Sequence, residues 1–119
     1  MAFHNDLGKS GEQLAVEFLK KKGYQILERN FEFQKAEIDI IAQKGDVACA
    51  VEVKTRSTAD FGNPQEFLKP QQIKRLIVAM DHYITQNDME TEVRFDVVAI
   101  VKNKLGTRIE HLEDAFYHF

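Results

Sequence analysis

Apolar residues recur at helical spacing in two separate segments of the chain, and the first segment also carries terminal signals. Ser10 and Gln13 match a capping box, so we expect a helix with Ser10 as its N-cap. Three lysines at 20–22 suit the negative end of the helix dipole, and Gly23 suits the position just past the last turn. The apolar face of this helix is formed by Leu14, Ala15, Phe18 and Leu19.

The second helical pattern begins at Pro70, because proline fits the first turn of a helix. The polar run 86–88 ends it. The apolar stripe between these limits consists of Ile73, Leu76, Ile77, Met80, Tyr83 and Ile84.

Strand patterns fill the rest of the chain and give the order α-β-β-β-α-β-β. The connection through the second helix should return the next strand parallel to the third one. We therefore predict an α/β protein with a small mixed β-sheet flanked by helices. Its 119 residues fit a single domain over 1–119. The strands are expected at 24–33, 37–42, 47–54, 93–101 and 108–112.

The hairpin formed by the second and third strands gathers acidic residues. If Gly45-Asp46 is its two-residue loop, Lys44 pairs with Val47, and counting outward sets Asp39 against Glu52 and Glu37 against Lys54. Opposed like charges are destabilising, so this register suggests a divalent cation between Asp39 and Glu52. The other face would be wholly apolar and belong to the core, with Ile38, Ile40, Ala42, Val47, Cys49, Val51 and Val53.

This constellation suits metal-assisted hydrolysis of a phosphodiester. Mg²⁺ usually takes one or two protein carboxylates and keeps waters, so Asp39, Glu52 and the carbonyl of Val53 are the expected ligands of Mg²⁺ or Mn²⁺. Lys54 would orient the attacking water or stabilise charge on phosphorus. Glu37 is expected to support the site, either by orienting Lys54 or by binding a second ion. The competing interpretation is a solvated sheet face with a cross-strand salt bridge.

Composition narrows the possible functions. The formal net charge of −3 argues against a protein that coats nucleic acid by bulk charge, although a local basic rim is allowed. No segment approaches the apolar length of a membrane span, and residues 1–6 lack a signal-peptide pattern. The single cysteine, Cys49, excludes a disulfide framework, and a cytoplasmic location follows as the default. The rim candidates are the lysines at 20–22, Lys69, Lys74, Arg75 and Arg56.

Several other polar residues receive structural interpretations. The lysines at 20–22 are assigned to the helix end rather than to a DNA-binding patch. Arg94 and Asp96 share a strand face and are expected to pair with each other. The four histidines show no metal-ligand spacing and are expected at the surface: His4, His82, His111 and His118.

Motifs along nearly the whole chain resemble a known family. Asp39 followed by Glu52-Val53-Lys54 resembles the PD-(D/E)XK nucleases. More closely, the runs Gly11-Glu12, 37–42, 51–56, Phe61-Gly62 and 94–98 look like the UPF0102 (YraN-like) family. Two positions depart from its pattern: Ala36 stands where the family usually has glycine, and Gln71 or Gln72 replaces a basic residue.

The resemblance implies a restriction-endonuclease-like αβββαβ core related to archaeal Holliday junction resolvases. It also implies a catalytic role for Glu12, beside Asp39, Glu52 and Lys54, and it is consistent with a homodimer. Glutamine at this place on the second helix is also used in related nucleases, so Gln72 joins Arg56, Lys74 and Arg75 as an expected nucleic-acid contact. The loop at 55–69 is expected to form part of the substrate wall.

The first hypothesis is therefore a Mg²⁺- or Mn²⁺-dependent endonuclease acting on DNA, branched or single-stranded. The alternative is a non-catalytic nucleic-acid-binding module of the same fold that works with a protein partner. The intact Asp39, Glu52 and Lys54 favour the enzyme, whereas the acidic net charge favours the module. A metal-binding scaffold without a nucleic-acid role is the third hypothesis.

Overall fold

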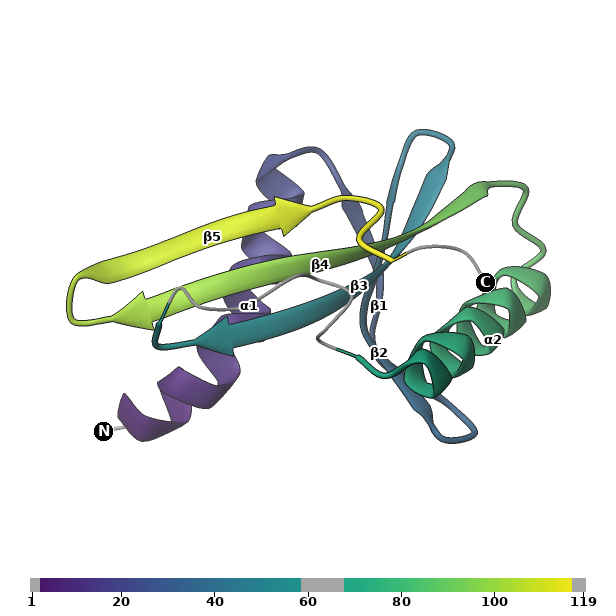
Figure 1. Cartoon of the computed structure of the whole chain (residues 1–119). Helices are drawn as coiled ribbons and strands as arrows, with labels where there is room; N and C mark the ends of the chain where they lie inside the picture. The colour runs from purple at the N-terminus through teal and green to yellow at the C-terminus, as the bar shows by residue number, and fades with distance from the viewer. Residues whose placement is uncertain (1–2, 59–67, 117–119) are drawn as a thin grey trace.

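The computed structural model describes the backbone of residues 3–58 and 68–116 and the side chains of residues 11–58 and 68–116. A five-stranded sheet has the order β1-β2-β3-β4-β5 and is packed by two helices (Figure 1). All neighbouring strands are antiparallel except β3 and β4, which run parallel and are joined through α2. The predicted mixed sheet is thus confirmed. The elements are α1 (Phe3–Lys21), β1 (Gln25–Phe33), β2 (Ala36–Lys44), β3 (Val47–Arg56), α2 (Pro70–Gln86), β4 (Glu92–Asn103) and β5 (Gly106–Leu112).

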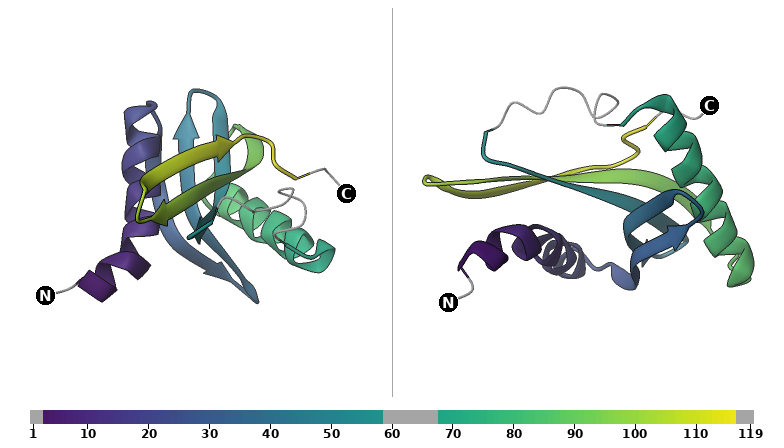
Figure 2. Two further views of the ribbon diagram at one scale, coloured as in Figure 1. Left: turned by 60° about the vertical axis from the view of Figure 1, so that its left-hand side comes forward. Right: turned by 90° about the horizontal axis from the view of Figure 1, so that it is seen from below.

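The two helices bury different sides of the sheet (Figure 2). Ala15, Val16 and Leu19 of α1 pack in one core cluster, and the buried residues of α2 pack in another. Periodicity predicted α2 well, because it begins at Pro70 and its apolar stripe faces the sheet. No helix in the described part of the chain is long and apolar enough to cross a membrane.

Helix α1 begins earlier than the capping pattern predicted. It starts at Phe3 and continues through Ser10, so the assignment of Ser10 as N-cap was wrong. No proline interrupts residues 3–10, and a glycine inside a helix costs only about 1 kcal/mol, so Gly8 does not stop it. The end was predicted correctly: Gly23 has φ 96°, and its amide donates to the Lys20 carbonyl at 3.0 Å.

The β2–β3 hairpin has the predicted register near its turn and separates farther out. Lys44 pairs with Val47, and the paired ladder extends to Ile40 opposite Val51. Beyond that pair, β2 continues alongside β1 to Ala36, whereas β3 continues alongside β4 to Arg56. We call this separation the fork.

The fork corrects two predictions. Glu37 lies opposite Glu32 of β1 rather than opposite Lys54, because β2 has left β3 at that point. The hairpin also has no single apolar face: Ile38 packs in the α2 cluster, whereas Ile40 packs in the α1 cluster. The face that carries the acids is partly core as well, since Ala48 and Ala50 pack beneath α2.

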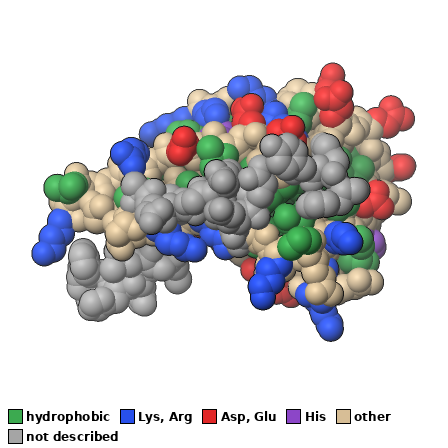
Figure 3. Space-filling view, viewed as in Figure 1, with side chains coloured by type: hydrophobic (Ala, Val, Ile, Leu, Met, Phe, Trp, Pro, Cys, Tyr) green, Lys and Arg blue, Asp and Glu red, His purple; other side chains and the backbone are tan. Residues whose placement is uncertain are grey.

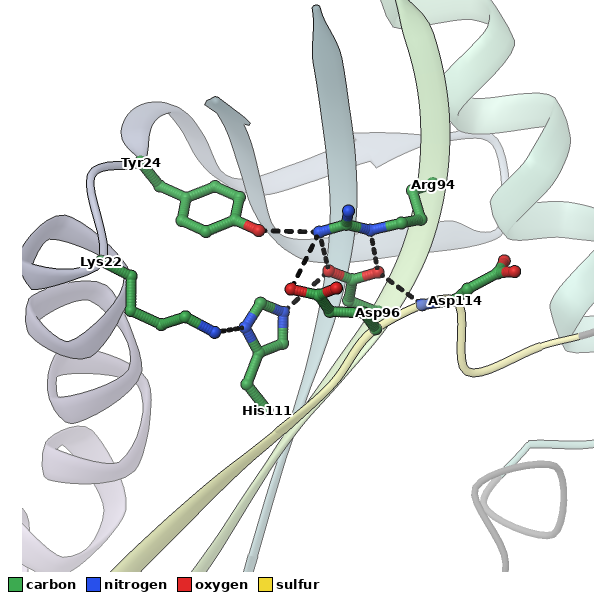
Figure 4. Close-up of polar contacts among 7 residues, drawn as sticks. Lys22, Tyr24, Arg94, Asp96, His111 and Asp114 are labelled. Carbon is green, nitrogen blue, oxygen red and sulfur yellow. Dashed lines mark hydrogen bonds and ion pairs between the residues drawn. The ribbon is translucent and has the colours of Figure 1, made fainter. Parts of the chain in front are cut away.

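Asp96 is the centre of a buried polar cluster that ties the end of the chain to the sheet (Figure 4). Its carboxylate accepts hydrogen bonds from Arg94 at 2.9 and 3.0 Å and from the Asp114 amide at 3.0 Å, and it lies 2.7 Å from Nε2 of His111. The predicted Arg94–Asp96 pair is confirmed. The prediction of a surface His111 was wrong, because its side chain is 2% exposed. Lys22 contacts the other ring nitrogen at 2.7 Å.

Candidate active site

Asp39 lies where β2 and β3 separate, and its side chain bridges them. Its Oδ2 accepts a hydrogen bond from the backbone amide of Val53 at 2.8 Å. The carboxylate therefore satisfies a strand amide beyond the last paired residues of the hairpin. This bond fixes Asp39 beside the stretch of β3 that contains Glu52 and Lys54.

Glu52 and Asp39 form a pair of closely spaced acids. Burial raises the pKa of Glu52 to about 7, and the negative charge of Asp39 contributes in the same direction, while Lys54 opposes it. Burial also raises the pKa of Asp39, although the Val53 amide counteracts this. Nζ of Lys54 lies 3.3 Å from Oε2 of Glu52, and both side chains are mostly covered. Two half-buried carboxyl groups beside one ammonium therefore share the fork.

Glu12 reaches this cluster from α1. Burial is the main cause of the raised pKa of Asp39, and the charge of Glu12 contributes in the same direction. Oε1 of Glu12 accepts hydrogen bonds from Arg29 at 3.0 and 3.1 Å and from Asn30 at 3.1 Å. Both donors come from β1, and Gln13 also accepts from Arg29 at 3.0 Å.

Sequence reasoning missed Arg29 and Asn30. Asn30 has φ 53°, in the left-handed region that asparagine tolerates better than most residues. The sequence signal for a functional role was two neighbouring polar residues, Arg29 and Asn30, inside an otherwise apolar strand pattern. Its partner on α1 could not be found without the tertiary structure.

The approach of α1 to the fork depends on Gly11. A Cβ at this position would collide with Oγ1 of Thr55, the residue after Lys54. The missing side chain therefore lets α1 lie against the end of β3, and the next residue, Glu12, contacts Arg29 and Asn30 of β1.

A pocket of about 230 Å³ opens beside Glu52, between the start of β2 and α2. Two predicted nucleic-acid contacts, Gln72 and Arg75, line it together with Lys35 and Glu37. Gln72 has a structural bond as well, because its Oε1 accepts the Lys69 amide at 2.9 Å at the start of α2.

The other predicted contacts lie in different places. Lys74 lines a neighbouring pocket. Arg56 is exposed at the end of β3 and donates to the Thr55 carbonyl at 3.0 Å. The predicted wall at 55–69 lies largely outside the described residues, since only 55–58 and 68–69 belong to them.

The donor chemistry of Asp39 and Glu52 fits a hard divalent cation. Among the described side chains, those of residues 11–58 and 68–116, no group of three or more His, Cys, Asp or Glu is arranged to hold a metal. Mg²⁺ needs fewer, because it commonly takes one or two carboxylates and completes its shell with water. Two acids whose mutual repulsion raises the pKa of Glu52 would be stabilised by such a charge.

Taken together, the chain is an α/β protein with a mixed five-stranded sheet, two helices and an acid–lysine cluster at the fork of that sheet. Residues 11–100 match the model of the uncharacterised protein family UPF0102, and the chain belongs to this family. It is similar to UPF0102 proteins of Christiangramia forsetii (59% identical) and Flavobacterium psychrophilum (60%), each over 100% of both chains. A UPF0102 protein of Bacteroides fragilis is 44% identical over 98% of this chain and 97% of its own length.

Proposed function

We propose that this protein is a Mg²⁺- or Mn²⁺-dependent endonuclease with a restriction-endonuclease-like core. The proposed substrate is DNA, branched or single-stranded, and the proposed location is the cytoplasm. The observation that carries the proposal is the pair of half-buried acids, Asp39 and Glu52, with Lys54 ion-paired at 3.3 Å. Perturbed carboxyl groups beside a lysine are typical of sites that handle phosphoryl charge.

Each residue of the cluster has a distinct role in this proposal. Asp39 and Glu52 would hold the cation, with the Val53 carbonyl as a third ligand. A bound divalent cation supplies positive charge at the phosphate and lowers the pKa of a water molecule. Lys54 is held at the site by Glu52, so its ammonium can donate a hydrogen bond to the attacking water or to a phosphate oxygen.

Glu12 acts differently from the two acids of the pair. Its Oε1 is engaged by Arg29 and Asn30, so its role in the proposal is to hold these β1 side chains against the fork. Arg29 is 41% exposed and is therefore accessible to a phosphate near Asp39. Bidentate contact with phosphate is a common use of arginine.

The test is a cleavage assay on the full chain with labelled single-stranded, duplex, flap and four-way-junction DNAs. Wild-type protein and Lys54→Ala are compared in Mg²⁺, Mn²⁺ and EDTA. Lys104→Ala is the matched control, because Lys104 lies exposed in the turn between β4 and β5.

We expect cleavage by wild type and Lys104→Ala, none in EDTA, and a rate about 100-fold or more lower for Lys54→Ala. If none of the DNAs is cleaved, the proposed nuclease activity is contradicted. Binding retained in that case would support the non-catalytic module instead.

A further inference from the structure

A second pocket, of about 420 Å³, adjoins the pocket beside Glu52. It lies between the β1–β2 turn and the outer side of α2, and Lys35 and Arg75 line both pockets. The two adjoining pockets form a hollow surface along α2, with Glu52 lining one of them. We call it the α2 groove.

The α2 groove combines cations with apolar surface. Lys35, Lys74 and Arg75 supply three positive charges, and within the described residues none of them pairs with an acid at salt-bridge distance. Figure 3 shows Lys and Arg side chains around the start of α2 and the β1–β2 turn. Glu37 and Glu52 also line the groove, so the three cations leave it a small excess of positive charge, opposite in sign to the net charge of the chain, −3.

The apolar part of the groove comes from Phe33 and Val78. The Val78 side chain is 50% exposed, although it lies in a helix whose other large apolar residues face the sheet. The Phe33 ring stacks on His82 with centroids 4.0 Å apart and an interplanar angle of 19°. An aromatic ring held by such stacking, next to an exposed valine, is suited to contact a flat unsaturated ring.

We propose that the α2 groove binds a single-stranded segment of nucleic acid that flanks the scissile phosphate. The part of this inference that places the scissile phosphate at Glu52 depends on the proposed function. Cations that track a backbone beside an aromatic surface are the usual elements of single-strand binding. In a duplex the bases stack on one another, so Phe33 and Val78 would have no base to contact, and only the cations would be used.

The test measures equilibrium binding of the full chain in EDTA, so that metal-dependent cleavage plays no part. The probes are a labelled oligothymidylate and the same strand paired with oligoadenylate. The groove variant is Lys35→Ala/Lys74→Ala/Arg75→Ala. The control variant, Lys20→Ala/Lys21→Ala/Lys104→Ala, has the same change in net charge at exposed positions on the end of α1 and the β4–β5 turn.

We expect wild type to bind the single strand more tightly than the duplex. The groove variant should weaken single-strand binding about tenfold or more and lower the slope of log K against log salt by about 2, or about 0.7 for each lost phosphate contact. The control variant should change the slope little. Phe33→Leu keeps an apolar side chain and should weaken single-strand binding about fivefold through lost stacking.

The proposal is overturned if the groove and control variants change the slope equally. It is also overturned if duplex binds as tightly as single strand, if Phe33→Leu has no effect, or if wild type binds neither probe. Because cleavage is not measured, the result is separate from the proposed function. A protein that binds the single strand through the groove but cuts no DNA in Mn²⁺ would contradict the nuclease alone.

Discussion

The Asp39 carboxylate accepts the backbone amide of Val53 at 2.8 Å, across the point where β2 and β3 part. The Asp39 side chain replaces the backbone acceptor that β2 no longer offers to Val53. The Val53 amide therefore keeps a hydrogen-bond partner although the strands have separated. Burial raises the pKa of Glu52, and the negative charge of Asp39 raises it further. Structure at the fork and electrostatics at the candidate site therefore depend on one residue.

Two substitutions separate these contributions of Asp39. Asp39→Ala leaves the Val53 amide without its side-chain acceptor, so we expect a loss of about 1–3 kcal/mol in the free energy of unfolding without metal. Asp39→Asn retains an amide oxygen as acceptor and removes the repulsion with Glu52, so its stability should stay close to that of wild type. Urea unfolding in EDTA measures both. Equal losses in the two variants would contradict the role of the hydrogen bond.

Divalent cations should stabilise the wild-type protein against heat. A cation bound by the folded state alone adds about 2.7 kcal/mol at a concentration 100 times its Kd. We expect Mn²⁺ to raise the Tm of wild type but not that of Asp39→Asn or Glu52→Gln. Glu110→Gln on exposed β5 is the control and should respond like wild type. A Tm rise of the same size in all four proteins would place the bound cation elsewhere.

Local patterns were sufficient to predict the framework of this site. Gly45-Asp46 set the register that placed Asp39 near Glu52, and Pro70 marked the start of α2. The alternation of apolar and polar residues could not predict the fork, because beyond Ile40 and Val51 β2 pairs only with β1 and β3 pairs only with β4. Glu37 was misplaced for that reason: its partner is Glu32 on β1.

Contacts between distant segments were also beyond local reasoning. His111 has no recognisable spacing to Asp96 or Lys22, yet the fold encloses all three in one cluster. The hydrogen bonds from Arg29 to Glu12 join β1 to α1 across 17 positions. Only the packing of α1 against the sheet makes these side chains neighbours.

The Glu12–Arg29 contact should matter more for catalysis than for stability. The pair is partly exposed, and such ion pairs contribute about 0.2–1 kcal/mol. Arg29→Ala should therefore unfold almost like wild type, while DNA cleavage falls about 10- to 100-fold, because a charged hydrogen bond to the substrate phosphate is worth about 1.5–3 kcal/mol. Gln13→Ala removes only a secondary partner of Arg29 and serves as the control. Unchanged cleavage by Arg29→Ala would exclude this role.

Asp96 should make stability depend on pH in the acid range. Burial alone would raise its pKa, but hydrogen bonds from His111 and Arg94 hold the pKa below the usual 3.8. Other polar groups contact the two partners of Asp96. Arg94 donates a hydrogen bond to Tyr24 and lies 3.8 Å from Glu113, and Lys22 contacts His111. A carboxyl group with a lowered folded pKa stabilises the protein above its unfolded value, and this contribution is lost as pH falls through the folded pKa.

Asp96→Asn tests this assignment. Breaking a buried charged pair typically costs about 3–5 kcal/mol, so the variant should be less stable than wild type near neutral pH. The difference in the free energy of unfolding should shrink as pH falls below the usual value of 3.8 and through the lowered folded pKa, because wild-type Asp96 then becomes protonated. Denaturant unfolding at several pH values measures it. A difference that stays constant over this range would mean that the Asp96 charge is not what stabilises the cluster.

The contact between Gly11 and Thr55 should control how closely α1 approaches the site. Alanine is a better helix former than glycine by about 1 kcal/mol, so on helix propensity alone Gly11→Ala would stabilise the protein. We expect the opposite, a loss of about 1–3 kcal/mol, because the new Cβ would overlap Oγ1 of Thr55. Thr55→Ala removes that oxygen and should restore most of the loss in the double variant.

A double-mutant cycle by urea unfolding measures the coupling, which we expect at about 0.5–3 kcal/mol. The same cycle read by cleavage reports on the site. Gly11→Ala should lower the rate because a displaced α1 moves Glu12 away from Asp39, and adding Thr55→Ala should recover it. Additive effects on stability would mean that α1 does not need the glycine for its approach to β3. Coupled stability with an unchanged cleavage rate would separate the position of Glu12 from catalysis.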